Sequence, residues 1–214
     1  MTAHRYRAIF FDFDGVLVES VDIKTRAFAK LFEKEGEGVV RQVVAYHLRH
    51  GGLSRYEKIR YYYDHLLRRP LSDEQLNDVA TAFSRLVVDE VVEAPYVKGA
   101  LEFLTAFHDR CALYTISGTP EQEMKDIIRR RGMDVFFKGV YGAPRKKDDL
   151  VRMIMQDEGY AADEALFVGD ALTDLEAAKA NSVAFIARVA DGSHNFFEGM
   201  NLPIISDLTE LNPF

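Results

Sequence analysis

The chain has 214 residues, of which 48% are hydrophobic and 12% aromatic, enough for one sizeable core or for a core with a smaller insert. A formal net charge of -7 opposes binding to nucleic acid, and no basic patch alternates with aromatic residues. The single cysteine, Cys111, excludes a disulfide framework, and the apolar run near the N-terminus is too short and too acidic for a signal peptide or a membrane span. We therefore expect a cytoplasmic protein with no nucleic-acid and no membrane partner.

The first predicted element is a buried strand at residues 7–11, directly followed by Asp12 and Asp14. Further apolar runs rich in β-formers occur at residues 111–116, 138–141, 165–168, 183–187 and 203–205. These runs are continuous rather than alternating, which is typical of parallel strands covered on both faces. Helical patterns at residues 99–109, 119–132 and 146–159 separate several of them. This alternation predicts a doubly wound α/β sheet.

The helical pattern at residues 119–132 carries a start signal. Thr119 and Gln122 have the spacing of a capping box, and Pro120 would occupy the first helical position. Gly132 is a plausible stop. We therefore predict a helix that begins directly after Thr119.

The segment between the first two predicted strands has a different character, because no strand alternation occurs in it. One helix ends at Gly36, and another begins at Ser72, which forms a capping-box pattern with Gln75. Between them, "HGGLSRYEKIRYYYDHLL" is loop-like at its glycine pair and helical afterwards. We predict an all-helical insert over residues 19–95, and a core built from residues 1–18 and 96–214.

Three predicted strands end in polar groups. These groups are Asp12 and Asp14, Ser117 and Gly118, and Asp170 with Asp174. In a doubly wound sheet, catalytic groups lie at the carboxyl ends of strands near the point where the strand order reverses. Carboxylates from two strands form a hard-oxygen site that suits Mg²⁺. Turn formation by the aspartates and a capping role for Ser117 remain alternatives at this point.

The ordered set "DFDGVLVES", "ISGT", the lysines of "APRKK" and "VGDALTD" resembles the haloacid dehalogenase (HAD) superfamily of hydrolases, in particular its members similar to phosphoglycolate phosphatase and β-phosphoglucomutase. The match covers essentially the full chain. The resemblance implies a Rossmann-like doubly wound parallel sheet with an inserted all-helical cap domain. It also implies Mg²⁺ as cofactor and a small phosphorylated metabolite as partner. The oligomeric state stays open between a monomer and a homodimer.

The resemblance further implies a role for each matching residue. Asp12 would be the nucleophile that becomes an aspartyl phosphate, and Asp14 the general acid and then the general base. Ser117 and the amide of Gly118 would bind phosphoryl oxygens. Dehalogenase and phosphonatase relatives typically lack the second acid, so Asp14 favours phosphate-ester chemistry.

The remaining roles are those of a lysine and of the metal ligands. Lys147 would balance the charges of nucleophile and phosphate, since relatives tend to have this lysine three residues before a leucine, although Lys146 remains an alternative. The metal ligands would be Asp12, Asp14 through its backbone carbonyl, and Asp170, with Asp174 as a further metal residue whose direct ligation stays open.

In this superfamily the cap closes over the phosphate and selects the substrate. The loop "HGGLSRYEKIR" is the natural place for such contacts, so Arg55 and Lys58 are predicted to contact a second anionic or hydroxyl-rich part of the substrate. An ordinary exposed helix start is the alternative. Glu19 and Gly118 depart from the commonest pattern, which has Asp and Asn there.

We therefore expect a Mg²⁺-dependent phosphatase that hydrolyses a phosphoglycolate- or sugar-phosphate-class metabolite through an aspartyl-phosphate intermediate. A sugar phosphomutase needs the same core residues, and only "GLSR" in the cap points to it. A non-catalytic domain that binds a phosphorylated ligand or a protein is the third possibility. It would be expected to lack a reacting group, yet all of them are present.

Overall fold

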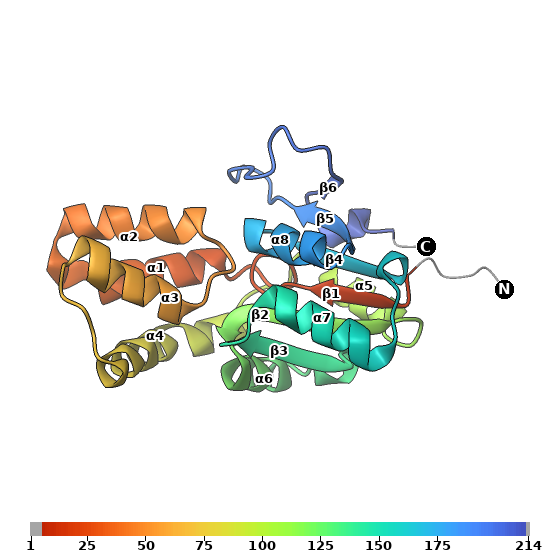
Figure 1. Cartoon of the computed structure of the whole chain (residues 1–214), viewed down its shortest axis with the longest axis horizontal. Helices are drawn as coiled ribbons and strands as arrows, with labels where there is room; N and C mark the ends of the chain where they lie inside the picture. Colours follow the sequence, from red (N-terminus) through yellow and green to blue (C-terminus); the bar gives the residue numbers. More distant parts are fainter. Residues whose placement is uncertain (1–5, 213–214) are drawn as a thin grey trace.

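The computed structural model describes residues 6–212, which form a parallel sheet with helices on both faces and a helical lobe at one end (Figure 1). Six strands run in the order β3-β2-β1-β4-β5-β6, and every neighbouring pair is parallel. The strands are β1 (Ala8–Phe11), β2 (Ala112–Pro120), β3 (Gly139–Ala143), β4 (Ala165–Gly169), β5 (Ala184–Arg188) and β6 (Ile204–Ile205). The predicted Rossmann-like α/β sheet is confirmed.

The central strand β1 is buried on both faces. Ile9 and Phe11 belong to one apolar cluster, with α5 (Ala100–Phe107) and α6 (Glu121–Arg130). Ala8 and Phe10 belong to a second cluster, with α7 (Lys147–Glu158) and α8 (Leu172–Ala180). Because helices cover both sides, every position of β1 is apolar and the sequence lacks alternation.

The chain passes from β1 to β2 and β3 on one side of the sheet, and then returns to β4 on the other side of β1. The strand order therefore reverses between β1 and β4, where a crevice opens at the carboxyl ends of the strands. Phe11, the last residue of β1, pairs in register with Thr115 of β2 and with Val168 of β4. Asp12, Ser117 and Asp170 consequently emerge at the same edge of the sheet.

The lobe between β1 and β2 is all-helical, as predicted (Figure 1). Its α-helices are α1 (Val21–Leu31), α2 (Glu37–Arg49), α3 (Arg55–Tyr61) and α4 (Asp73–Glu93), with a π-helical turn at Tyr62–Leu66. The capping box of Ser72 and Gln75 is confirmed at the start of α4. Short 3-10 turns occur at Glu33–Glu35, Asp134–Phe136, Ala162–Glu164 and Leu208–Glu210.

Two adjacent chain segments connect this cap to the core. The amide of Glu19 donates to the carbonyl of Pro95 at 3.0 Å, and the amide of Val97 donates to the carbonyl of Leu17 at the same distance. An isolated antiparallel bridge joins Val18 to residue 96. The predicted division at 18/19 and 95/96 falls where these two segments pass between the cap and the core, although the domain limits themselves remain a prediction.

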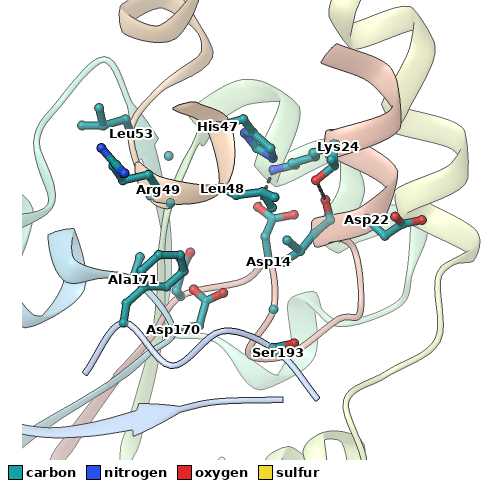
Figure 2. A pocket seen from close by; sticks show the side chains of 18 of the residues that line it. Asp14, Asp22, Lys24, His47, Leu48, Arg49, Leu53, Asp170, Ala171 and Ser193 are labelled. Carbon is teal, nitrogen blue, oxygen red and sulfur yellow. Dashed lines mark hydrogen bonds and ion pairs between the residues drawn. The ribbon is translucent and has the colours of Figure 1, made fainter. Parts of the chain in front are cut away.

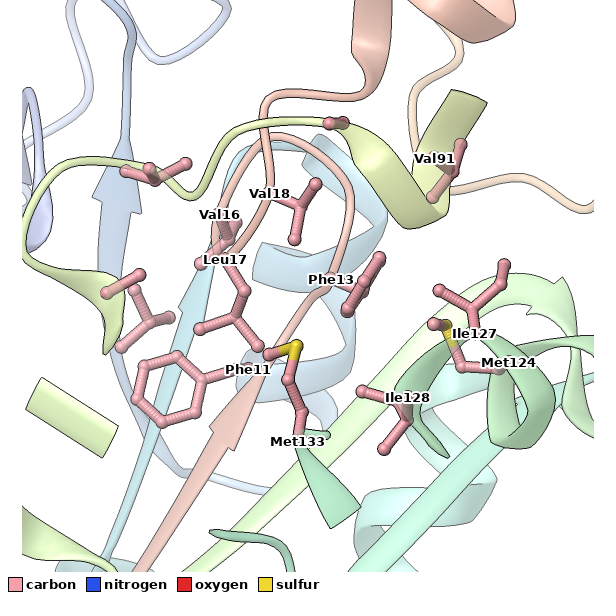
Figure 3. Close-up of a cluster of buried hydrophobic side chains, with 14 of the residues drawn as sticks. Phe11, Phe13, Val16, Leu17, Val18, Val91, Met124, Ile127, Ile128 and Met133 are labelled. Atoms are coloured by element: carbon pink, nitrogen blue, oxygen red, sulfur yellow. The ribbon is translucent and has the colours of Figure 1, made fainter. Parts of the chain in front are cut away.

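Apolar side chains also pack beside the two segments that connect the cap to the core. Figure 3 shows Phe13 of the loop after β1 facing Val91 of α4 and Met124 and Ile127 of α6, and all four side chains are almost fully buried. The same cluster extends into the cap, so the base of the cap and the core share one continuous hydrophobic interior. None of the described helices is long and apolar enough to span a membrane.

The helix predicted after Thr119 is present as α6, but the predicted capping box of Thr119 is wrong. Strand β2 continues through Thr119 to Pro120, where it still pairs with Ala143 of β3, and α6 begins only at Glu121. Sheet pairing therefore outweighs the local capping pattern, and no side chain caps the start of α6. The extended backbone instead directs the Thr119 hydroxyl toward the edge of the sheet that carries the acids.

Candidate active site

A pocket of about 580 Å³ lies between the cap and the carboxyl ends of the strands. Figure 2 shows Asp14 and Asp170 on its core side, with His47, Leu48 and Arg49 of α2 on the opposite side. The pocket is therefore enclosed by residues from both lobes.

Asp12 directly follows β1 at the bottom of this pocket and is only 3% exposed. Its Oδ1 accepts a hydrogen bond of 2.7 Å from the amide of Phe13, and its Oδ2 lies 2.8 Å from Nζ of Lys147. Burial raises the pKa of Asp12 to about 7; the Lys147 ammonium opposes that rise, and the charges of Asp174 and Asp14 add to it. Lys147 thus favours the ionised form that a nucleophile needs.

Lys147 begins α7 and is buried, whereas the neighbouring Lys146 is exposed. Its ammonium contacts Asp12 and also lies 2.6 Å from Oδ1 of Asp174. Burial alone would lower the pKa of Lys147, but the two carboxylates raise it overall. Of the two candidate lysines, only Lys147 is thus brought to Asp12.

Asp170 and Asp174 approach Asp12 from the end of β4 and the start of α8. One carboxylate oxygen from each of the three residues lies within 4.8 Å of the others. Burial, followed by the charges of Asp12 and Asp174, raises the pKa of Asp170 well above its usual range. Asp174 uses both oxygens within the protein, since Oδ1 meets Lys147 and Oδ2 accepts from the amide of Ala171 at 3.1 Å.

This arrangement fits a divalent cation. Among the described residues no group donates a hydrogen bond to the Asp170 carboxylate, and Asp12 adds a second hard oxygen beside it. Gly15 has φ +74°, and a Cβ there would collide with Oδ2 of Asp170. The turn after β1 therefore needs glycine both for its conformation and for the space around this carboxylate.

Asp14 lies in a ring of hydrogen-bond donors. Ser20 Oγ donates to its Oδ1 at 2.6 Å, and Lys24 of α1 forms an ion pair with its Oδ2 (Figure 2). The hydroxyls of Ser117 and Thr119 both lie 3.4 Å from Oδ2. Burial would raise the pKa of Asp14, but Lys24 and Ser20 lower it overall, so the carboxylate form is favoured in this arrangement.

The end of β2 supplies small groups to the site. Ser117 is almost fully buried, and its Oγ accepts from the amide of Thr119 at 3.0 Å. Gly118 lines the pocket, and a Cβ there would collide with the carbonyl of Gly52 in the cap loop. Core and cap backbones thus come close at this point, which explains why this position is glycine.

The two predicted cap residues both reach the pocket wall, but they have different partners. Arg55 is held by a bidentate ion pair with Glu123 of α6, with one N–O distance of 2.8 Å, and it also donates to Ser84 of α4. Lys58 donates to Nδ1 of His47 at 2.9 Å.

The residues of this site that were not anticipated include Lys24, His47, Glu123 and the hydroxyl of Thr119. The first three lie on helix surfaces, where the sequence gives no signal that distinguishes a site residue from a solvated one. Glu19, noted as a departure from the commonest pattern, forms an ion pair of 2.7 Å with Arg188 at the end of β5. Arg188 also donates to the carbonyl of Gly15 at 3.0 Å, so this pair supports the turn that follows Asp12 and Asp14.

Carboxylates at the ends of two parallel strands, a buried lysine beside them and a helical cap above them define the class: an α/β enzyme with a capped phosphoryl-transfer site. The family model for haloacid dehalogenase-like hydrolases matches residues 9–188. The chain belongs to this family, and it is a phosphoester hydrolase.

Several proteins that are similar to this chain in sequence are named as phosphatases or as a nucleotidase. A phosphoglycolate phosphatase of Pseudomonas savastanoi pv. phaseolicola is 27% identical, over 97% of this chain and 79% of the relative. A 5'-nucleotidase of Pseudomonas aeruginosa is 28% identical over 86% of this chain and 83% of its own length. CbbY from Rhodobacter sphaeroides, solved in complex with phosphate, has a TM-score of 0.72 at 20% identity, covering 97% of this chain and 96% of that one, and it supports the fold.

Proposed function

We propose that this chain is a Mg²⁺-dependent phosphatase that hydrolyses a small phosphorylated metabolite of the phosphoglycolate or sugar-phosphate class through an aspartyl phosphate on Asp12. One observation carries the proposal: Asp12 lies 2.8 Å from the buried ammonium of Lys147, in the pocket that also contains Asp14 and Asp170. A phosphorylated substrate that reached Asp12 would find a cation, an acid–base group and further carboxylates within one enclosed space.

In the first step, a carboxylate oxygen of Asp12 forms a bond to phosphorus while the bond from phosphorus to the substrate oxygen breaks. Asp14, once protonated, gives its proton to the departing alkoxide, which leaves as an alcohol. In the second step, Asp14 takes a proton from a water molecule that attacks the phosphorus. The bond between phosphorus and the Asp12 oxygen breaks, inorganic phosphate departs, and Asp12 and Asp14 return to their starting states.

Mg²⁺ would be held by Asp12, Asp170 and the backbone carbonyl of Asp14, with Asp174 close enough to ligate it or to position Lys147. When bound, it would supply positive charge that lets a phosphate approach this cluster of acids. Lys147 adds a second, fixed positive charge. Ser117 and the amide of Gly118 would bind phosphoryl oxygens.

The cap contacts favour hydrolysis over the mutase alternative. A mutase must bind a second phosphate, and a guanidinium is the best single group for that task. Arg55, the predicted substrate contact, is already bound by Glu123 and reaches a substrate only by exchanging that partner. The names of the Pseudomonas relatives likewise support a phosphatase, with phosphoglycolate as the first substrate to test.

A phosphate-release screen over phosphorylated metabolites, with Mg²⁺ and with Asp12→Asn as the blank, tests the proposal. We expect at least one compound to be hydrolysed, and the variant to be slower by about 1,000-fold or more, as for other lost nucleophiles. Chelation of the metal should remove the activity, and added Mg²⁺ should restore it. If the wild type matched the variant on every compound, hydrolysis would be the wrong reaction, and sugar-phosphate interconversion would be assayed next.

A further inference from the structure

One buried cation of the pocket differs from the others in its partners. Arg55 is paired with Glu123 and Arg188 with Glu19, and the partly buried Lys24 is paired with Asp14. Lys58 is only 3% exposed, yet no carboxylate among residues 6–212 lies within ion-pair distance of its ammonium. A buried charge without a counter-ion is costly, so its presence at a pocket wall calls for an explanation.

The partner that Lys58 does have is neutral. Its Nζ donates to Nδ1 of His47 at 2.9 Å, and the carbonyl of the same histidine is 3.5 Å away. An ammonium has three N–H groups and no lone pair, so Nδ1 must be the acceptor and His47 carries its proton on Nε2. Burial, followed by the charge of Lys58, lowers the pKa of His47 to about 2, which agrees with a neutral ring. His47 thus orients Lys58 without neutralising its charge.

The surroundings of the pair are apolar. The imidazole of His47 packs on Phe28 with ring centroids 4.9 Å apart, and Nζ of Lys58 lies 5.9 Å from the centre of the same ring. Burial lowers the pKa of Lys58 to about 7, the nearby charge of Lys24 acts in the same direction, and Asp14 and Asp170 oppose it. A negatively charged ligand group that enters the pocket would supply the missing counter-ion and favour the ammonium form of Lys58.

The position of the pair on the pocket wall identifies the part of a substrate that would meet it. Lys58 and His47 belong to the cap, whereas Asp12, where the phosphoryl group must react, belongs to the core. A substrate with its phosphate on the core therefore presents its alcohol portion to the cap. This step depends on the proposed phosphatase function.

We propose that Lys58, positioned by His47, binds a carboxylate on the alcohol portion of the phosphorylated substrate. A carboxylate fits better than a second phosphate, because one ammonium with a single neutral neighbour offers few donors. Phosphate sites usually combine several, and the nearby guanidinium of Arg55 is bound by Glu123. The preferred substrates are then phosphorylated hydroxy acids rather than phosphorylated neutral alcohols.

The test uses two substrates with the same two-carbon skeleton, phosphoglycolate and ethyl phosphate, of which only the first has a carboxylate. We expect the wild type to have the higher kcat/KM for phosphoglycolate. Lys58→Met keeps the length of the side chain and should lower the ratio of the two kcat/KM values by about 10- to 100-fold, the usual effect of one charge-assisted hydrogen bond. Lys34→Met, the same change at an exposed cap position, should leave the ratio unchanged.

His47 is tested as a positioning residue by a pair of variants. His47→Leu removes the acceptor and should lower the same ratio, whereas His47→Asn places an amide oxygen near the position of Nδ1 and should restore most of it. A loss that is equal in both variants, or that affects both substrates equally, would overturn the positioning role.

A binding measurement separates this inference from the proposed function. Calorimetric titration of Asp12→Asn with each compound and Mg²⁺ should give tighter binding of phosphoglycolate, and the additional Lys58→Met change should abolish the difference. Such binding without turnover by the wild type would refute the hydrolase and leave the carboxylate site standing. Phosphate release with no preference dependent on Lys58, or no preferential binding of phosphoglycolate, would refute the carboxylate site.

Discussion

Lys147 forms ion pairs with two buried carboxylates, those of Asp12 and Asp174. Both acids are buried, and the ammonium opposes the rise that burial causes in the pKa of Asp12. Asp174 in turn helps to hold the lysine in place, since its Oδ1 lies 2.6 Å from the ammonium. One residue therefore contributes both to the chemistry proposed for Asp12 and to the stability of the carboxyl edge of the sheet.

We predict that Lys147→Met lowers kcat/KM by at least about 100-fold, because the charge that opposes protonation of Asp12 is lost. The variant should also lose about 3 kcal/mol of unfolding free energy, since it leaves two acids buried without a cation. Phosphate release and urea unfolding measure the two effects. Lys146→Met is the matched control, and an equal loss of activity in both variants would contradict the assignment of Lys147.

At the scale of elements, the contact between α3, α4 and α6 joins the cap to the core through polar groups. Arg55 of α3 binds Glu123 of α6, and Ser84 of α4 donates to the same carboxylate at 2.6 Å. The Arg55 guanidinium also lies 4.8 Å from the ring of Phe83. Because both charged side chains are largely buried, each depends on the other as its counter-ion, and removal of either one would leave a buried charge unpaired.

We predict that Glu123→Gln lowers the free energy of unfolding by about 3 kcal/mol, because it leaves the Arg55 guanidinium buried without an anion. Glu102→Gln, at an exposed position of α5, should change it by less than about 0.5 kcal/mol. The double variant Arg55→Met with Glu123→Leu should recover most of the loss. If Glu123→Gln unfolded at the same urea concentration as the wild type, the ion pair would not stabilise the folded protein.

The strands and their acids were predictable because their signals are local. A continuous apolar run followed by Asp12, or by Asp170, identifies both the strand and the polar group at its end. Helix α2 was not identified separately, because its start at Gly36 has no side-chain cap. The helix start at Thr119 was mispredicted because pairing of β2 with β3, a non-local contact, determines where the strand ends.

The partners of the site residues were not predictable for a related reason. His47 meets Lys58 only because α2 and α3 pack together, and Glu123 meets Arg55 only because the cap lies on α6. Each of these helices has several other polar residues at similar spacing. Which one is buried depends on the rotation of the helix in the assembled protein, and a single sequence does not specify that.

At the scale of the whole molecule, the neutral buried His47 links stability to pH. The pKa of histidine in an unfolded chain is about 6.5, and in the native protein burial lowers the pKa of His47 to about 2. Between these values the unfolded chain binds a proton that the native protein does not bind. The stability from neutral His47 is therefore complete above pH 6.5 and is lost as the pH falls.

We predict that lowering the pH from 7 to 5 reduces the free energy of unfolding of the wild type by about 2 kcal/mol more than that of His47→Asn. In this variant the side chain at position 47 cannot bind a proton. Urea unfolding of both proteins at the two pH values measures the difference. The comparison cancels the contributions of Asp12 and the other acids, which both proteins share. Identical pH dependence of the two proteins would show that His47 is accessible to protons in the native state.

The hydrogen-bonded pair of connectors, Glu19 with Pro95 and Leu17 with Val97, means that the polypeptide departs from the sheet and rejoins it at almost one spot. A polypeptide segment of any length can be inserted between those two points without distorting a strand or shifting its register. Evolution can thus exchange the lid while the carboxylates beneath it stay fixed, which lets one reaction serve many metabolites.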